Sequence, residues 1–486
     1  MLNKFWITAV ILGGLTLSVP LAKGQETSNG TQQPVPPIQP ATNEENAAAP
    51  KPAASGLPIT EQEPDVPDSH PLAGAQGLTL GSSAGNRNFL LPSLGVTTQL
   101  EVDKYNSSTA IKVQPNSATY LTGGLAVNRT SGGSQFLLDY LGGGTFSNTA
   151  SPGNSVIQNL EFSEVNHWGR WSVMVGDHVS YTSQSPFGFG GLGGLGNFGV
   201  SPGNGEGSSS GFRHGFLPDQ SILINGPHQV SNAAIGQTDY ALSHRSSLTF
   251  VGSYGILNFA ESGFQNSTSV GLQGGYNYSL DRVNSIAVFY RFDDLSFPIV
   301  SERVKDHTAQ FSYARRITGR MNFQVSAGPD ILESKSPISG PNRTISWAAS
   351  ASFKQQYRLL AVGLTYDHYL TGGSGILVGA KTDLVAGSLD RTLNRNWHGA
   401  ISVGYSRNQP LQGTNANASL SSPQAWFGSV RVSRQFVRYG SFFFAYGASK
   451  QSALASICSL PACNVASLIQ TISVGYNWGL RPIALK

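Results

Sequence analysis

The sequence predicts an all-β protein, an antiparallel transmembrane β-barrel of about 18 strands that follows a disordered N-terminal tail. Charged residues make up 12% of the chain, about half of the ~25% that is usual in globular proteins. Apolar and small polar residues alternate along most of the chain, and the turns between these runs alternate between short and long. A barrel wall with lipid on one side and water on the other produces this mixture, because successive residues of a strand point to opposite faces.

The N-terminus has the organisation of a cleavable export signal over residues 1–24. Lys4 provides a positive charge, an uncharged apolar stretch follows, and Ala22 and Gly24 are small residues at the positions that a signal peptidase reads. An uncleaved membrane anchor is the alternative, but the stretch contains Pro20 and is shorter than the ~20 residues of a membrane span. Loss of Lys4 and Lys23 lowers the formal charge from +4 by two, to +2. This balance argues against a nucleic-acid partner.

Residues 25–85 predict a disordered periplasmic linker. The stretch from Gln25 to Gly77 contains no aromatic residue, and prolines recur in it at Pro34, Pro36, Pro37, Pro40, Pro50, Pro52, Pro58, Pro64 and Pro67. Such a segment buries too little apolar surface to offset the entropy lost on ordering. A passive spacer is the preferred interpretation, and contact with peptidoglycan is the alternative.

Residues 86–486 repeat one unit, in which a strand, a tight polar turn, a second strand and a longer loop follow each other. In one strand, Trp397, Ile401 and Tyr405 share a face that is opposite to His398 and Ser402. The runs have the length of about 10 residues that a tilted strand needs to cross a bilayer. Counting these runs predicts 18 strands with both ends on the short-turn side. Sixteen is the alternative, because the first pair has the weakest pattern.

A soluble β-sandwich would also show alternating residues. Three features favour the membrane barrel instead. The second face is small and polar rather than richly charged, and short and long turns alternate strictly. Aromatic residues also gather near strand ends, as in interfacial girdles, at Trp168, Trp171, Trp397, Tyr476 and Trp478.

The barrel region resembles bacterial outer-membrane porins, by pattern and without a diagnostic motif. Its last strand, from Ile472 to Trp478, is similar to the signal that the barrel-assembly machinery reads, although Gly479 to Lys486 follow the final aromatic residue. The resemblance implies a location in the cell outer membrane, contact with outer-membrane lipids and, as in general porins, a homotrimer.

The connection over residues 183–235 is the third and longest external loop, and it is rich in glycine. In general porins the long third loop folds into the lumen, so the resemblance implies a constriction here. The candidate constriction residues are Pro186, Phe187, Phe189 and Phe198. A plug that closes the pore is a second interpretation of this apolar loop, and a mobile surface loop is an equally supported one.

Charged residues on the polar faces of the strands are expected to line the lumen. The acidic candidates outnumber the basic ones, which predicts a weakly cation-selective pore if the excess survives local pairing. The alternative is that these charges pair across strands and fill a packed interior. The candidates are Glu101, Asp103, Asp139, Glu161, Asp239, Asp293, Asp367 and Asp383 against Arg291, Lys381 and Arg431.

Cys458 and Cys463 are the only cysteines. Both fall in the last external loop, and the cell envelope is oxidising, so a local disulfide is predicted. No histidine accompanies them, so no metal site is expected, and no motif indicates a cofactor.

Three function classes remain for such a chain. The leading one is a porin-like channel for passive diffusion of ions or small hydrophilic solutes. The second is a non-conducting structural or adhesive barrel, plugged by the glycine-rich loop. A hydrolase at the barrel rim ranks third, because no Ser, His and Asp spacing indicates catalysis, and the chain is expected not to be an enzyme.

Overall fold

The computed structural model describes residues 70–76, 88–106, 111–148, 153–182, 212–218, 222, 228–318, 320–337, 340–411, 422–437, 439–452, 468–480 and 483–485. The predicted signal peptide (residues 1–24), the four predicted constriction residues (Pro186, Phe187, Phe189 and Phe198) and the predicted disulfide (Cys458 and Cys463) lie outside these residues. Among the described residues, no helix is both long and apolar enough to cross a membrane.

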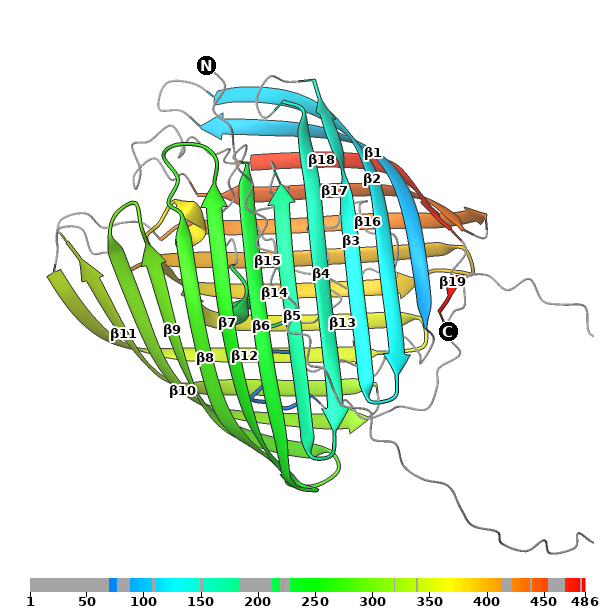
Figure 1. Ribbon diagram of the computed structural model, residues 1–486. Coiled ribbons are helices and arrows are strands. Elements are labelled where there is room, and N and C mark those ends of the chain that lie inside the picture. The colour runs from blue at the N-terminus through cyan, green and yellow to red at the C-terminus, as the bar shows by residue number, and fades with distance from the viewer. Residues whose placement is uncertain are drawn as a thin grey trace, which may run out of the picture. The chain divides into compact units, whose positions relative to one another are not determined.

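Eighteen long antiparallel strands form one closed barrel, as predicted, and the alternative of 16 strands is wrong. Each strand pairs with its neighbours in the chain, and β1 closes the barrel by pairing with both β2 and β18 (Figure 1). A two-residue strand, β19, adds to the start of β1. The bounds are β1 (Phe89–Asn106), β2 (Ile111–Ser131), β3 (Ser134–Ser147), β4 (Ser155–Trp168), β5 (Trp171–Thr182), β6 (Gln229–Ser243), β7 (Ser246–Phe259), β8 (Ser267–Ser279), β9 (Asn284–Phe297), β10 (Glu302–Thr318), β11 (Met321–Ser336), β12 (Gly340–Gln356), β13 (Leu360–Thr371), β14 (Ala380–Thr392), β15 (Trp397–Pro410), β16 (Gln424–Val437), β17 (Gly440–Gln451), β18 (Leu468–Gly479) and β19 (Ile483–Ala484).

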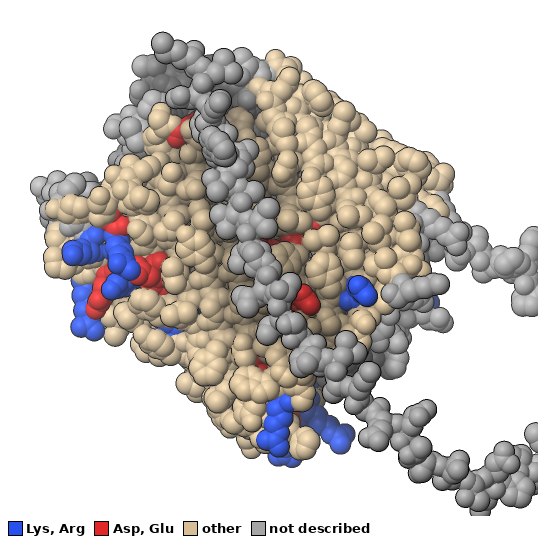
Figure 2. All heavy atoms as spheres, in the orientation of Figure 1, with Lys and Arg blue, Asp and Glu red and all other residues tan. Residues whose placement is uncertain are grey.

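The period-two pattern places apolar side chains outside and small or polar side chains inside. In β18, Ile472 and Val474 are exposed on the outer face, whereas Thr471 and Ser473 are buried on the inner face. Lys, Arg, Asp and Glu are sparse on the face drawn in Figure 2; both signs of charge gather at its left edge, and Lys and Arg lie at its lower tip. An apolar outer belt of this kind is stable only in contact with lipid, and it is the exterior of a transmembrane barrel.

Short turns close one end of the barrel, and side chains cap them. In the turn between β8 and β9, Asp281 Oδ1 accepts hydrogen bonds from the backbone N–H groups of Val283 and Asn284, both at 2.7 Å. The side-chain amide of Asn284 and these two N–H groups lower the pKa of Asp281. The carboxylate therefore stabilises the turn above its ordinary pKa, and this contribution is lost as the pH falls through the lowered value.

Strand pairing breaks between β12 and β13 at the long-loop end. Residues Ala349–Gln356 of β12 pair with Ala361–His368 of β13, and within the described residues the remainder of β12 pairs with β11 alone. Beyond the break, Leu370 of β13 packs on a cluster from the inner faces of β9, β10 and β11. The ends of β13 and β14 therefore turn into the barrel and lie against the inner surface of β9–β11.

Candidate functional site

The inner wall carries most of the charged residues that the sequence assigned to the lumen. Strand register places them on the same face as the buried polar residues Thr97, Gln99 and Thr249. The predicted residues that lie on this face are Glu101, Asp103, Asp139, Glu161, Asp239, Arg291, Asp293, Asp367 and Arg431. Arg431 is stacked over the Phe443 ring at 4.4 Å.

Asp383 is not on the inner wall, so its assignment to the lumen was wrong. It lies opposite His368 in the β13–β14 register, and His368 stacks on the outward-facing Trp347 with ring centroids 4.3 Å apart. Asp383 accepts hydrogen bonds on this outer side from His368 Nδ1 at 2.7 Å and from the Tyr366 hydroxyl at 3.2 Å. Knowing which residues of β13 face inward did not determine which residues of β14 do. The connection of residues 372–379 can join the two strands with either face of β14 turned inward.

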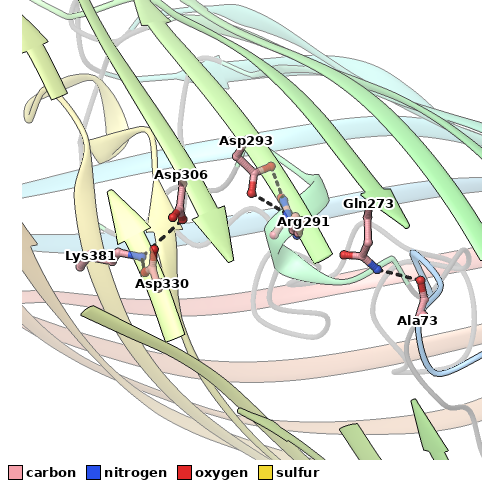
Figure 3. A network of polar contacts seen from close by, with 8 residues as sticks. Ala73, Gln273, Arg291, Asp293, Asp306, Asp330 and Lys381 are labelled. Atoms are coloured by element: carbon pink, nitrogen blue, oxygen red, sulfur yellow. Dashed lines mark hydrogen bonds and ion pairs between the residues drawn. The ribbon is translucent and has the colours of Figure 1, made fainter. Parts of the chain in front are cut away.

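Lys381 does reach the lumen, but by an unexpected route. It shares the outer side of β14 with Asp383, and only the inward turn of β13 and β14 brings it against the inner wall. Its Nζ contacts carboxylate oxygens of Asp306, at 3.4 Å, and of Asp330. All three side chains are almost fully buried. Figure 3 shows the side chains of Lys381, Asp306 and Asp330 pointing toward one another.

Three buried acidic residues on the inner wall were missed by the sequence analysis. They are Glu302, Asp306 and Asp330, which are at most 3% exposed. Strands were expected to be about 10 residues long, the length that crosses a bilayer, whereas β11 has 16 residues and continues to Ser336, so Asp330 lies near the end of the expected length. The sequence did hold a signal for these residues: polar side chains continue the alternation beyond the apolar stretch of each strand, which indicates that the strand extends past the bilayer.

The long third loop enters the lumen in its described part. Phe212 and Phe216 are buried against Met174, Ile235 and Val251 of the inner wall. The carbonyl of Gly215 accepts a hydrogen bond from Arg291, and the Arg291 guanidinium lies 4.3 Å from the centre of the Phe216 ring. Asp293 pairs with the same guanidinium at 2.6 Å (Figure 3). The described part of the loop, residues 212–218, therefore packs on the inner wall through both apolar and polar contacts.

A second segment in the lumen is residues 70–76, which fall within the predicted linker of residues 25–85. The prediction of disorder was wrong for these seven residues. Leu72, Ala73 and Ala75 are buried, and Gln76 forms an antiparallel bridge with Phe212 of the loop. We call residues 70–76 the inner segment.

The inner segment is held through its main chain. Asn277 Oδ1 accepts from the Ala73 N–H at 2.8 Å, and Gln273 Nε2 donates to the Ala73 carbonyl at 2.7 Å (Figure 3). Gln237 Oε1 accepts from the Ala75 N–H at 2.7 Å. On the other side, Arg213 Nη2 donates to the Leu72 carbonyl at 2.8 Å. The inner segment thus connects the wall formed by β6–β8 to the third loop.

Arg213 is a loop residue enclosed between these elements. Burial lowers its pKa to about 10, with the carboxylate of Asp367 acting in the opposite direction and Arg291 in the same one. A guanidinium with this pKa is still protonated at neutral pH. The junction between the loop and the inner segment therefore carries a positive charge.

The described lumen retains a small cavity beside the third loop. It measures about 40 Å³ and is bounded by residues 215–218, by the inner faces of β7–β9 and by residues 369–372. One water needs about 10–15 Å³ on this measure, so the cavity holds about three waters.

Gly275 makes room for the inner segment, which leads to a testable prediction. A Cβ on Gly275 would lie 2.5 Å from the Ala73 Cβ and 2.7 Å from the Phe289 Cβ. Gly275→Val is therefore expected to expel the inner segment and to abolish the protection of the Ala73 and Ala75 amides in hydrogen-exchange mass spectrometry. The control is Gly274→Val on the outer face, where the new Cβ meets only the Phe250 ring, at 3.5 Å. Equal protection in the two variants would contradict the docking.

The described residues contain no group of three or more His, Cys, Asp or Glu side chains arranged to hold a metal ion. No family model and no curated protein matches the chain. Several solved structures are similar to it over most of their length. They include Pseudomonas aeruginosa OpdQ (11% identity, 81% of this chain and 99% of that chain, TM-score 0.40), the outer membrane protein opdK from Pseudomonas aeruginosa (10%, 80% and 98%, TM-score 0.40) and a BenF-like porin from Pseudomonas fluorescens Pf-5 (12%, 80% and 99%, TM-score 0.42).

The strand pairing and the two faces of this chain define its class. The 18 long strands pair into one closed ring, in which each strand is hydrogen-bonded to both of its neighbours. An apolar outer belt with exposed Trp168, Trp171 and Trp478 surrounds a polar inner wall. The chain is an 18-strand transmembrane β-barrel of the outer-membrane type.

Proposed function

We propose that the chain is a channel for passive diffusion of ions and small hydrophilic solutes across the outer membrane. The observation that carries this proposal is the polar, charged inner wall of an 18-strand barrel, since barrels of this size enclose an aqueous lumen. The third loop and the inner segment constrict the lumen and set the size of the solute. The barrel acts as a pore and not as an enzyme.

The channel is proposed to be weakly cation-selective. The acidic residues of the described inner wall are the seven predicted there together with Glu302, Asp306, Asp330 and Asp390. The basic residues set against them include Arg291, Arg316, Lys354, Arg431, the loop residue Arg213 and Lys381. This excess gives the lumen a negative potential, which raises the local concentration of cations.

Substitution on a single strand tests the cation preference. Glu161 faces the lumen, and it lies opposite Asp139 in the register. Glu161→Gln is expected to shift the reversal potential in a salt gradient towards the value of a non-selective pore. The control is Glu164→Gln on the same strand, because Glu164 lies opposite the outward-facing Val175. A shift of equal size in the control would contradict a selectivity set by the lumen.

A sealed barrel with a structural or adhesive role is the second candidate function. The two segments ordered inside the lumen favour it, because together they bury Leu72, Ala73, Ala75, Phe212 and Phe216. The two candidates differ in one observable: a channel conducts in a planar bilayer, whereas a sealed barrel leaves the membrane silent.

Assembly is proposed to use the last strand. Ile472 to Trp478 lie in β18, which alternates apolar outward residues with small inward ones and closes the barrel on β1. We propose that the barrel-assembly machinery reads this strand. Peptidoglycan contact through the N-terminal tail and a homotrimer remain predictions.

A further inference from the structure

The wall around the inner segment presents amide groups in fixed orientations. Gln237 Nε2 donates to Asp239 Oδ2 at 2.8 Å, and Asn277 Nδ2 donates to Thr249 Oγ1 at 2.9 Å. Thr249 in turn donates to Asp239 Oδ1 at 2.6 Å. The donor side of both amides is thereby bound within the wall, and the acceptor oxygens are left to face the lumen.

These amides match the main chain of an extended peptide. Asn277 and Gln237 accept from N–H groups two residues apart, Ala73 and Ala75, and Gln273 donates to the carbonyl of Ala73. Gln273 and Asn277 lie on the inner face of β8 on either side of Gly275, so residue 73 is bound at both its N–H and its carbonyl. Recognition through the main chain resembles the binding of an extended peptide as an added β-strand, and it does not depend on the charge of the peptide's side chains.

The same surface restricts the size of the side chains that it accepts. Ala73 and Ala75 are fully buried. The wall is so close to Ala73 that a Cβ on Gly275 would lie 2.5 Å from the Ala73 Cβ. At the next position of the segment, a Cβ on Gly74 would lie 2.9 Å from Gln237 Oε1. Three consecutive small residues are therefore required at positions 73–75, whatever peptide supplies them.

We propose that the inner faces of β6–β8, through Gln237, Gln273, Asn277 and Gly275, form a binding site for an extended peptide with consecutive small residues. The inner segment occupies this site in cis. When the segment leaves, a separate peptide of the same kind binds in its place. This inference deepens the proposed function, on which it rests, by naming short peptides with small side chains as a class of ligand for the lumen.

Competition between the inner segment and a free peptide tests the proposal. In the full chain, Ala73→Phe places a large side chain where a methyl group is already enclosed, so it is expected to empty the site while every wall residue is retained. The probe is the acetylated and amidated peptide His-Pro-Leu-Ala-Gly-Ala-Gln, with binding measured by calorimetry in detergent. Binding is expected to the Ala73→Phe chain and not to the unsubstituted chain. Adding Asn277→Leu to the Ala73→Phe chain is expected to weaken binding about tenfold, because an N–H loses its buried acceptor.

The matched control is the same peptide with Phe in place of its first Ala, which is expected not to bind. A chain from which residues 70–76 are deleted is a second receptor with an empty site. Absence of binding to both receptors would overturn the proposal, as would equal binding to the unsubstituted chain or equal binding of the Phe peptide. Calorimetry needs no ion flow, so a silent bilayer with normal peptide binding would reject the channel and retain the site. Open channels without peptide binding would do the reverse.

Discussion

Deletion of residues 70–76 is expected to raise the single-channel conductance severalfold. The inner segment lies in the lumen between the wall at Asn277 and the loop residue Arg213, and Leu72, Ala73 and Ala75 are buried there. Its removal widens the path at the end of the barrel where the short turns lie. The measurement is the size of the current steps in a planar bilayer, at one salt concentration for both chains.

The control for this deletion keeps the segment and changes a single methyl group. Ala73→Gly preserves the main-chain N–H and carbonyl that Asn277 and Gln273 bind, so its conductance is expected to equal that of the unsubstituted chain. If the deletion left the steps unchanged, the inner segment would lie outside the path of the ions.

Lys381→Met is expected to destabilise the barrel by about 3–5 kcal/mol, because it leaves buried carboxylates without their counter-charge. Asp330 has a side-chain exposure of 0% and Asp306 of 4%, so water does not replace the lost ammonium group. The free energy of unfolding is measured by urea titration of the barrel in lipid vesicles, followed by tryptophan fluorescence.

Replacing the two carboxylates that face Lys381 with neutral amides is expected to restore much of the stability lost in Lys381→Met. In the chain with Lys381→Met, Asp306→Asn and Asp330→Asn, no buried charge is left uncompensated. The triple variant is therefore expected to unfold at a higher urea concentration than Lys381→Met alone. A single variant as stable as the unsubstituted chain would show that Lys381 does not hold the inward-turned ends of β13 and β14 against the wall.

Local periodicity was sufficient to predict the barrel. The alternation in Trp397, Ile401 and Tyr405 depends only on neighbouring residues, and it set both the strand count and most of the inner face. The same reasoning could not place Asp383 and Lys381. Their surroundings depend on the break between β12 and β13, and this break brings β14 against strands that lie more than 50 residues earlier.

The inner segment was beyond prediction for the same physical reason. Pro71, Gly74 and the neighbouring alanines have the composition of a linker, and nothing within the segment offsets its ordering entropy. The compensating contacts come from Gln273 and Asn277, which are 200 and 204 residues away in the chain. Only the closed barrel assembles these amides beside Gly275.

Single-channel recording of the refolded, unsubstituted chain in a planar bilayer with a salt gradient shows directly whether the barrel conducts ions. A cation-selective channel gives discrete open steps, with a reversal potential of the sign that cations produce. Silent bilayers from a correctly folded barrel, both with and without residues 70–76, would contradict the proposed channel and identify the chain as a sealed barrel.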